Sequence, residues 1–323
     1  MDTIVPSSPA NSSGREIVCV YGALRSGTTL LRLMLDSHPS LICSGETDFL
    51  FDHIEIDPST EELIYDLGAL ARDRIFRLSG LALPSRKEAS RALPELITGL
   101  RKKRRGTIIL MNHRRPEMIL RLLPKMKIIH IVRDPRDVAR SSIGMLWAGN
   151  VFVGVDHWVA TECAWDRVAC RLDSLRVFTL QYERLVAQPG NTLKDLCRFL
   201  GKEFDETMLS YDASSSYDKP DMAKIEQWRH QLTPYEIGLL EEKIGHLLEE
   251  RGYARSGHLP VVPSALFRAM LIARSKLSVK RRTIARYGLR DVTMLLVGRW
   301  LNISALRHRA ERNIDKKTIG FLK

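Results

Sequence analysis

The sequence predicts an α/β fold in which helices flank a central parallel sheet, with a helical extension at the C-terminus. The first observation is a repeated rhythm, because short apolar runs alternate with segments of helical spacing up to about residue 183. The second is a glycine-bearing turn between the first of these runs and an apolar helix, which is typical of a βα unit. The third is a change of composition after residue 256, where basic residues begin to dominate.

The totals are those of an ordinary globular chain. Its 323 residues are 44% hydrophobic and 27% charged, so a large core can be buried. The 5 cysteines lack paired spacing, which argues against a disulfide scaffold or a zinc site, and we expect no metal. Met1–Gly14 lacks the basic and apolar stretches of a signal peptide, and no apolar run reaches the roughly 18 residues of a membrane span. We therefore expect a disordered tail over residues 1–14 and a reducing, cytoplasmic setting.

The net charge of +12 lies in the C-terminal part of the chain. Residues 257–323 contain 15 Lys and Arg against 3 Asp and Glu, so the charges of the preceding residues sum to zero. This division predicts a neutral body over residues 15–256 and a basic helical extension over residues 257–323. The extension is expected to have an anionic partner of its own.

The first predicted strand, Val18–Tyr21, leads into a loop with the features of a phosphate site. Gly22 and Gly27 have G-x-x-x-x-G spacing, which directs backbone N–H groups and a helix N-terminus at one anion. Thr28 stands where nucleoside triphosphatases carry the lysine that meets the γ-phosphate, and Arg25 supplies the cation instead. The loop is therefore expected to bind a phosphate-like group and not an ATP phosphate chain with Mg²⁺.

A candidate base follows the loop. The helix after the loop is predicted from Thr28 to about Ser37, and a short strand follows at Leu41–Cys43. Glu46 comes just after that strand. A carboxylate soon after a phosphate loop is a candidate general base, and a helix cap or a surface charge is the structural alternative.

Two helices are expected next, over residues 59–79 and 85–105, because each has an apolar stripe at helical spacing. The second ends in the basic run Arg101–Arg105, followed by Gly106. A solvated helix C-terminus with a glycine cap accounts for this run, because cations favour that end of a helix. A nucleic-acid or localisation patch is the alternative.

The rest of the body continues the alternation of strands and helices. His130 is expected to be a core or edge histidine of its strand and not a catalyst. Thr233 and Glu236 predict a capping box at the start of a helix that runs to about Glu250, after which Gly252-Tyr253 closes the body. A mobile loop is expected at 211–221. The other expected strands are 107–110, 127–132 and 177–183, and the other helices are 117–123, one after residue 133, 156–174 and 192–200.

Two candidate anion sites are expected at the carboxyl ends of these strands. One is the Arg25 loop, and the other is the turn at Arg133, with Ser141 eight residues on at the start of a helix. Ligand groups in α/β sheets gather at this edge. Together the two sites suit a ligand charged at both ends, such as a nucleotide with separate 5′- and 3′-phosphates, because arginine makes forked phosphate contacts.

These motifs resemble those of the sulfotransferases that use 3′-phosphoadenosine-5′-phosphosulfate (PAPS). Arg133 and Ser141 are similar to the pair that holds the 3′-phosphate in that family. Tyr182-Glu183 resembles a strand end whose tyrosine lies near the adenosine, and Gly45-Glu46-Thr47 sits where tyrosylprotein and many bacterial members carry a catalytic glutamate. The stretch similar to the 5′-phosphosulfate loop consists of Arg25, Ser26, Gly27, Thr28 and Thr29.

The resemblance covers about residues 15–255 and implies a P-loop-like sulfotransferase fold and an enzyme. It implies in-line transfer of a sulfuryl group from PAPS to an acceptor hydroxyl, for which positioning and charge stabilisation dominate. Glu46 would take the acceptor proton, with His113 as the next candidate. Arg25, with Arg114 or Lys219, would stabilise charge on the bridging oxygen. Arg114 stands where relatives usually have a lysine motif.

The acceptor is not encoded in these motifs. The resemblance leaves a saccharide, a glycolipid, a tyrosine or a small metabolite open, and a carbohydrate or glycolipid is preferred. The glycine-rich Arg-Lys-Gly loop of the cytosolic small-molecule sulfotransferases is absent, which argues against a steroid or phenol acceptor.

Two other functions are alternatives to this one. A nucleotide or small-molecule kinase would use Asp134 as a magnesium ligand, but Thr28 in place of the loop lysine argues against it. A nucleic-acid-binding protein would use Arg101–Arg105 and the basic extension. Few aromatic residues lie among these charges and no recognition motif appears, so nucleic acid is disfavoured.

The extension itself has apolar residues at helical spacing among its cations, such as Leu266, Met270 and Leu277, and a second apolar stretch at Val292–Leu301. Basic helices with apolar and Trp positions can lie on an anionic membrane surface, here the inner one. Packing of the extension on the body, with solvated arginines, is the alternative.

Overall fold

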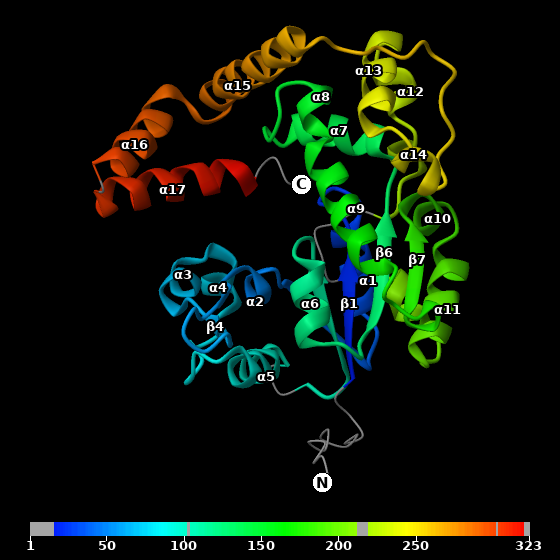
Figure 1. The fold of residues 1–323 in the computed structure, drawn as a ribbon, viewed down its shortest axis with the longest axis vertical. Coiled ribbons are helices and arrows are strands. Elements are labelled where there is room, and N and C mark those ends of the chain that lie inside the picture. Colours follow the sequence, from blue (N-terminus) through cyan, green and yellow to red (C-terminus); the bar gives the residue numbers. More distant parts are fainter. Residues whose placement is uncertain (1–15, 102–103, 212–218, 302, 320–323) are drawn as a thin grey trace.

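The computed structural model describes residues 16–101, 104–211, 219–301 and 303–319. Its centre is a five-stranded sheet of order β2-β5-β1-β6-β7, in which every neighbouring pair is parallel. The predicted α/β class with a central parallel sheet is therefore confirmed (Figure 1). The strands are β1 (Ile17–Tyr21), β2 (Leu41–Glu46), β5 (Thr107–Asn112), β6 (Lys127–Val132) and β7 (Val177–Gln181).

Both faces of this sheet are covered by helices, because its strands are apolar on both sides. Along β1, Cys19 and Tyr21 belong to one hydrophobic cluster, and Val18 and Val20 belong to the other. Burial of such side chains stabilises a fold by about 1.5–3 kcal/mol each. The helices that contribute to the two clusters are α5 (Ala89–Leu100), α6 (Pro116–Leu122) and α9 (Asp156–Ala169) on the first face, and α1 (Thr28–Asp36), α10 (Tyr182–Ala187) and α11 (Pro189–Leu200) on the second.

The helix predicted over residues 59–79 is wrong in its first part. Instead, β3 (Ile54–Ile56) and β4 (Leu63–Tyr65) form an antiparallel pair, and the turn between them places Glu61 at φ 57°, which a helix cannot accommodate. Two short helices follow, α3 (Leu67–Arg72) and α4 (Arg74–Ser79), capped by Asp66 and Asp73. The two aspartate caps thus divide a stretch that apolar spacing alone predicted to be one continuous helix.

The helix predicted over residues 85–105 is limited to Ala89–Leu100, so most of the basic run lies outside it. Gly106 has φ 150° and leads into β5 instead of capping the helix. Arg101 donates to the carbonyl of Gly106, and Arg104 donates to Asp36 at 2.8 Å. These two arginines are therefore bound to the edge of the body. Residues 102–103 of the predicted run lie outside the described residues.

The bounds of other elements also differ from those predicted. The helix predicted from 156 to 174 ends at Ala169, and Tyr182 begins α10 instead of ending a strand. The capping box of Thr233 and Glu236 is confirmed, but its helix breaks at Gly245. The remaining helices of the body are α2 (Phe49–Asp52), α7 (Pro135–Gly144), α8 (Val151–Gly154), α12 (Trp228–Gln231), α13 (Pro234–Ile244) and α14 (Leu247–Glu250), with 3₁₀ turns at Ser174–Arg176, Glu206–Leu209 and Met222–Lys224.

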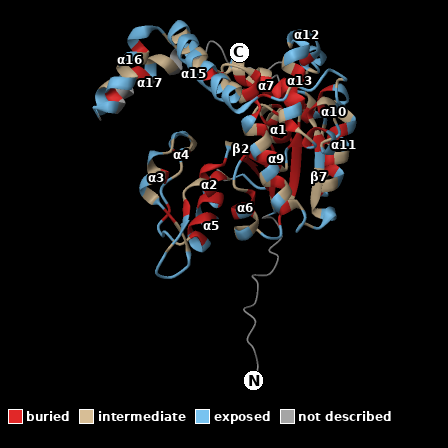
Figure 2. Cartoon of the chain, turned by 45° about the horizontal axis from the view of Figure 1, so that its top comes forward, coloured by how far each residue is buried: buried red, intermediate tan, exposed pale blue. Residues whose placement is uncertain are grey.

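The C-terminal part forms an arm of three helices, α15 (Ala265–Tyr287), α16 (Leu289–Trp300) and α17 (Ser304–Ile319). In Figure 1, α15 leads away from the body and α17 runs back beside α16. The arm is joined to the body through the segment before α8. There the Gly149 N–H donates to Ser275 Oγ at 2.8 Å, and Asn150 donates to the Leu271 carbonyl. Much of the arm is exposed (Figure 2). The tail predicted over 1–14 and most of the loop predicted over 211–221 lie outside the described residues.

Candidate active site

The loop between β1 and α1 is shaped by two close backbone approaches. A Cβ at Gly22 would lie 2.2 Å from the Ile131 carbonyl oxygen, so β6 leaves no room for a side chain there. Gly27 has φ 87°, and a Cβ on it would lie 2.1 Å from the ring of Tyr182. The two glycines of the motif are therefore required by contacts with β6 and α10, and the second sets the loop against the Tyr182 ring.

The loop carries donors that suit an oxyanion. No side chain caps the start of α1, so the N–H groups of its first turn are available to a ligand. Ser26 is fully buried, and within the described residues its hydroxyl has no hydrogen-bond partner. Arg25 has φ 70°, and its Nε donates to Ser141 Oγ at 2.9 Å. Loop N–H groups, the Ser26 hydroxyl and the Arg25 guanidinium thus form one anion-binding cradle.

Arg133 lies at the other side of the same cavity. Its guanidinium stacks 4.2 Å from the ring centre of Tyr182 and donates to the Arg25 carbonyl at 3.2 Å. The cavity between these groups has a volume of about 200 Å³. Its lining includes Arg25, Gly27, Thr28, Thr29, Arg133, Tyr182 and Lys219, seven of the residues predicted to bind the nucleotide.

The two other residues predicted for this site, Ser26 and Ser141, belong to it through the loop. Ser26 is part of the cradle, and Ser141 touches it through Arg25. Ser141 does not stand at the start of a helix, because α7 already begins at Pro135. The eight residues from Arg133 to Ser141 correspond to about two helical turns. At that position on α7, Ser141 accepts the hydrogen bond from Arg25 of the loop.

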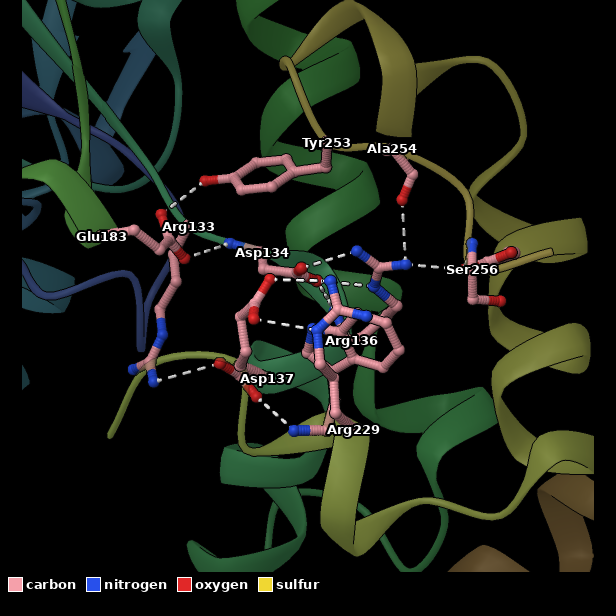
Figure 3. A network of polar contacts seen from close by, with 12 residues as sticks. Arg133, Asp134, Arg136, Asp137, Glu183, Arg229, Tyr253, Ala254 and Ser256 are labelled. Carbon is pink, nitrogen blue, oxygen red and sulfur yellow. Dashed lines mark hydrogen bonds and ion pairs between the residues drawn. The ribbon is translucent and has the colours of Figure 1, made fainter. Parts of the chain in front are cut away.

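A buried network fixes the turn that carries Arg133 (Figure 3). Asp134 accepts hydrogen bonds from Arg136 at 2.9 Å and 2.7 Å, and Arg136 also donates to Glu241 at 2.6 Å. The Arg136 guanidinium stacks 3.7 Å from the ring of Trp228. Both oxygens of Asp134 are therefore engaged by Arg136, which argues against its use as a magnesium ligand. The sequence patterns single out Arg133 and Asp134 in this run, but not Arg136 or Glu241.

The main chain of the same turn is held by Glu183. The Asp134 N–H donates to the Glu183 carboxylate at 3.0 Å, and the Tyr253 hydroxyl donates to its other oxygen at 2.8 Å (Figure 3). Burial raises the pKa of Glu183. The Tyr-Glu pair thus has two roles, since Tyr182 stacks on Arg133 while Glu183 anchors the next residue of the turn.

A second cavity of about 530 Å³ lies on the other side of the first turn of α1. It shares Thr28 and Thr29 with the first cavity, and Glu46 and His113 also line it. Glu46 is exposed and is the last residue of β2, which extends beyond the predicted strand; Gly45 before it has φ 99°. The first turn of α1 therefore separates a small cavity that contains Arg25 and Arg133 from a larger one in which Glu46 and His113 are the candidate bases.

His113 is held in one orientation. The backbone N–H of His113 donates to Asp48 Oδ1 at 2.8 Å, and the ring Nδ1 lies 2.8 Å from the Gly22 carbonyl oxygen. Because a carbonyl can only accept, this contact assigns a ring proton to Nδ1, so that in the neutral imidazole the lone pair is on Nε2. Among the described residues, the buried Nε2 has no hydrogen-bond partner. Burial raises the pKa of the supporting Asp48 carboxyl, with His113 opposing that shift.

Arg114, which is predicted to support the leaving group, is not among the lining residues of either cavity. It donates to Asp52 at 2.6 Å and lies 4.0 Å from Asp48. Burial lowers the pKa of its guanidinium, but the two carboxylates outweigh it and raise the pKa overall. His130 is buried, as expected of a core histidine, with Nε2 3.1 Å from Glu162. Within the described residues, no group of three or more His, Cys, Asp or Glu side chains gathers as metal ligands do.

A family model described as "Sulfotransferase family" matches residues 18–206, more than half of the chain. The match begins in β1 and ends after α11, so it includes the loop, Glu46, His113, Arg133 and Tyr182.

Two relatives carry related names. Protein-tyrosine sulfotransferase 2 of Gallus gallus is 24% identical over 249 residues, which cover 72% of this chain and 64% of that protein. Omega-hydroxy-beta-dihydromenaquinone-9 sulfotransferase Stf3 of Mycobacterium bovis is 29% identical over 174 residues, which cover 49% of this chain and 44% of that protein. The chain thus spans less than two thirds of the length of these curated relatives.

Solved structures share the fold. The sulfotransferase domain of the olefin synthase of Synechococcus PCC 7002 superposes with a TM-score of 0.59 at 20% identity, covering 77% of this chain and 98% of that domain. The sulfotransferase domain from the curacin biosynthetic pathway gives a TM-score of 0.54, also at 20% identity, covering 77% of this chain and all of that domain. At this level of identity, the likeness concerns the fold.

Proposed function

The chain belongs to the sulfotransferase family, and from that premise we propose that it transfers the sulfuryl group of PAPS to a hydroxyl of an acceptor. One observation carries the proposal: two cavities meet at the first turn of α1, one suited to a nucleotide with two separate anionic groups and the other lined by candidate bases.

The smaller cavity fits the proposed donor. The loop and Arg25 would hold the 5′-phosphosulfate, while Arg133 would hold the 3′-phosphate with Ser141 behind Arg25. Tyr182 would face the adenosine, and Lys219 lines the same space. The buried, unpartnered Ser26 hydroxyl is the kind of group that a bound oxyanion satisfies. The donor supplies an activated sulfuryl group, and these residues orient it.

In the larger cavity, we propose Glu46 as the base that takes the acceptor proton. Glu46, at the end of β2, lines the same cavity as Thr28 and Thr29, the residues that this cavity shares with the donor cavity. His113 is the second candidate. In the neutral ring its Nε2 carries a lone pair, and this nitrogen makes no hydrogen bond among the described residues. Arg25 would then stabilise the charge that develops on the bridging oxygen as the sulfuryl group leaves.

The acceptor is proposed to be a hydroxyl compound, with a carbohydrate or glycolipid preferred. The names of the two relatives refer to a protein tyrosine and to an omega-hydroxyl of a menaquinone, so both a phenol and an alcohol are chemically within reach of such sites. The kinase alternative is weakened by the engagement of Asp134 with Arg136.

We also propose that the body over residues 15–256 forms the catalytic domain and that the arm docks on an anionic membrane surface, placing the enzyme at the cytoplasmic side. Leu266 and Trp300 are 83% and 84% exposed. Exposed cations, among them Lys276, Lys280 and Arg281, lie beside the apolar positions of α15. Charge complementarity favours an anionic lipid surface over a second copy of this basic arm. No described helix is both long and apolar enough to cross a bilayer.

The test of the proposed function is incubation of the full-length protein with ³⁵S-labelled PAPS, or with γ-³²P-labelled ATP and Mg²⁺, and a panel of saccharide, lipid-linked and phenolic hydroxyl compounds. The proposal expects label transfer from PAPS in the presence of EDTA. Transfer from ATP and none from PAPS would identify a kinase instead.

A further inference from the structure

The larger cavity has a feature that proton abstraction does not use. Three arginines line it, Arg32, Arg101 and Arg104, against the two carboxylates of Asp36 and Glu46. We propose that Arg32 forms an anion subsite here and that the acceptor is a hydroxyl compound with a carboxylate, phosphate or sulfate group. This inference rests on the proposed function, because it names the class of acceptor for the same site.

Arg32 is the centre of the subsite. It is half-buried, and across the described part of the chain no hydrogen bond or ion pair engages its guanidinium. A guanidinium that is partly removed from water normally finds a partner, because desolvation of an unpaired charge is costly. An oxyanion of the acceptor would supply that partner through a forked pair of hydrogen bonds.

The other charged groups of this wall are already committed. Arg104 donates to Asp36 at 2.8 Å and to the Leu41 carbonyl at 3.0 Å, while Asp36 also accepts from the Cys43 N–H at 3.0 Å. Asp36 is thus held by Arg104 and the backbone and does not neutralise Arg32 through an ion pair. The local balance stays positive.

The geometry places the anion beyond the hydroxyl. Arg32 follows Thr28 by four residues on α1, a rise of about 6 Å, so it stands one turn away from the wall shared with the donor cavity. Glu46 and Leu41 are the two ends of β2, so they are separated by about 16 Å along the strand. Arg104 contacts the Leu41 end. An acceptor would therefore extend from Glu46 toward Arg32, with its anionic group about one helical turn from the reacting oxygen.

Two matched pairs of probes test this proposal, one of saccharides and one of phenols. In each pair, one compound carries a carboxylate and the other is neutral. Glucuronate is compared with glucose, and 4-hydroxyphenylacetate with 4-hydroxyphenylacetamide. Dissociation constants are measured by ligand-detected NMR on the full-length protein saturated with 3′-phosphoadenosine-5′-phosphate (PAP). At least one anionic compound should bind about tenfold more tightly than its neutral partner, and Arg32→Gln should remove that preference while neutral binding stays unchanged.

Arg91→Gln is the matched control, because Arg91 is exposed on α5 and lines neither cavity. It should leave the preference intact. If no anionic probe binds more tightly than its partner, or if the preference survives Arg32→Gln, the subsite is overturned. Failure of PAP to bind would instead count against the proposed function, and the same pairs measured without PAP would still decide the role of Arg32.

Discussion

At the scale of single residues, the donor cavity depends on backbone conformations that most side chains avoid. Arg25 has φ 70°, a region in which a residue other than glycine is strained, yet its carbonyl and its Nε are both tied, to Arg133 and to Ser141. These two bonds connect the loop with α7. The surroundings thus hold Arg25 where it can face a phosphosulfate.

The first prediction concerns Arg133. Arg133→Ala should weaken the binding of PAP by about 10- to 100-fold, because it removes charge-assisted hydrogen bonds to the 3′-phosphate. AMP lacks that phosphate and should lose much less. Calorimetric titration of both nucleotides checks this, and equal losses for PAP and AMP would show that Arg133 does not recognise the 3′-phosphate.

The second prediction concerns the base. Glu46→Gln should lower turnover by roughly 10²–10⁴-fold. It should leave PAP affinity nearly unchanged, because Glu46 lines the acceptor cavity and not the donor cavity. Steady-state kinetics with a responsive acceptor, and PAP titration, measure the two effects. Near-normal turnover in Glu46→Gln, together with a large loss in His113→Gln, would assign the proton to His113.

Sequence reasoning was strongest at residues whose role follows from chain spacing. Gly22, Gly27 and Arg25 were predicted from one motif, because a phosphate loop needs those types at those intervals. Arg32 and Asp48 were not, since the role of Arg32 depends on a cavity formed with distant segments and that of Asp48 on its contact with His113. A lone arginine on a helix gives no signal until a cavity is seen beside it.

At the scale of elements, the five central strands were predicted because buried parallel strands are nearly continuous apolar runs. The β3–β4 pair was missed for the opposite reason. Each of its strands has three residues, and Leu63 also fits a helical stripe, so periodicity could not separate the two structures. The end of α5 was misjudged because the basic run was assigned to a helix terminus, whereas Arg104 binds Asp36 across the chain.

The third prediction tests the network that joins α7 to α13. Arg136→Met should lower the free energy of unfolding by about 3 kcal/mol or more, because Asp134 and Glu241 would remain as buried, unpaired carboxylates. Urea unfolding measures the difference. Arg198→Met is the matched control, since its ion pair with Asp195 is exposed to solvent and its loss should lower the free energy of unfolding far less. Equal effects of the two substitutions would contradict the structural role of Arg136.

At the scale of the whole molecule, the positive charge and the exposed apolar residues coincide on the arm. On α15, the exposed Leu266, Met270, Leu277 and Ile284 recur at intervals of four and seven, so they share one side of the helix. The opposite side carries Leu271 and Ser275, which contact the segment before α8. The arm therefore turns one face to the body and presents an apolar and basic face outward.

The fourth prediction is that the full-length protein sediments with liposomes that contain anionic phosphatidylglycerol and does so less at higher salt. The double variant Leu266→Ser and Trp300→Ser should sediment less, because both side chains would insert among the lipids. Leu175→Ser, which changes an 81% exposed leucine outside the arm, should sediment like the unmodified protein. Absence of sedimentation at either salt concentration would leave the arm without a membrane role.

The wall formed by Thr28 and Thr29 between the two cavities also affects the order in which substrates bind and products leave. Each of the two cavities is open to solvent, and these two threonines are the lining residues that they share. Because the two cavities share only these lining residues, we expect donor and acceptor to bind side by side, so that neither has to precede the other. We expect random-order kinetics, in which either product can depart first and a single molecule that bridges the threonine wall would inhibit against both substrates.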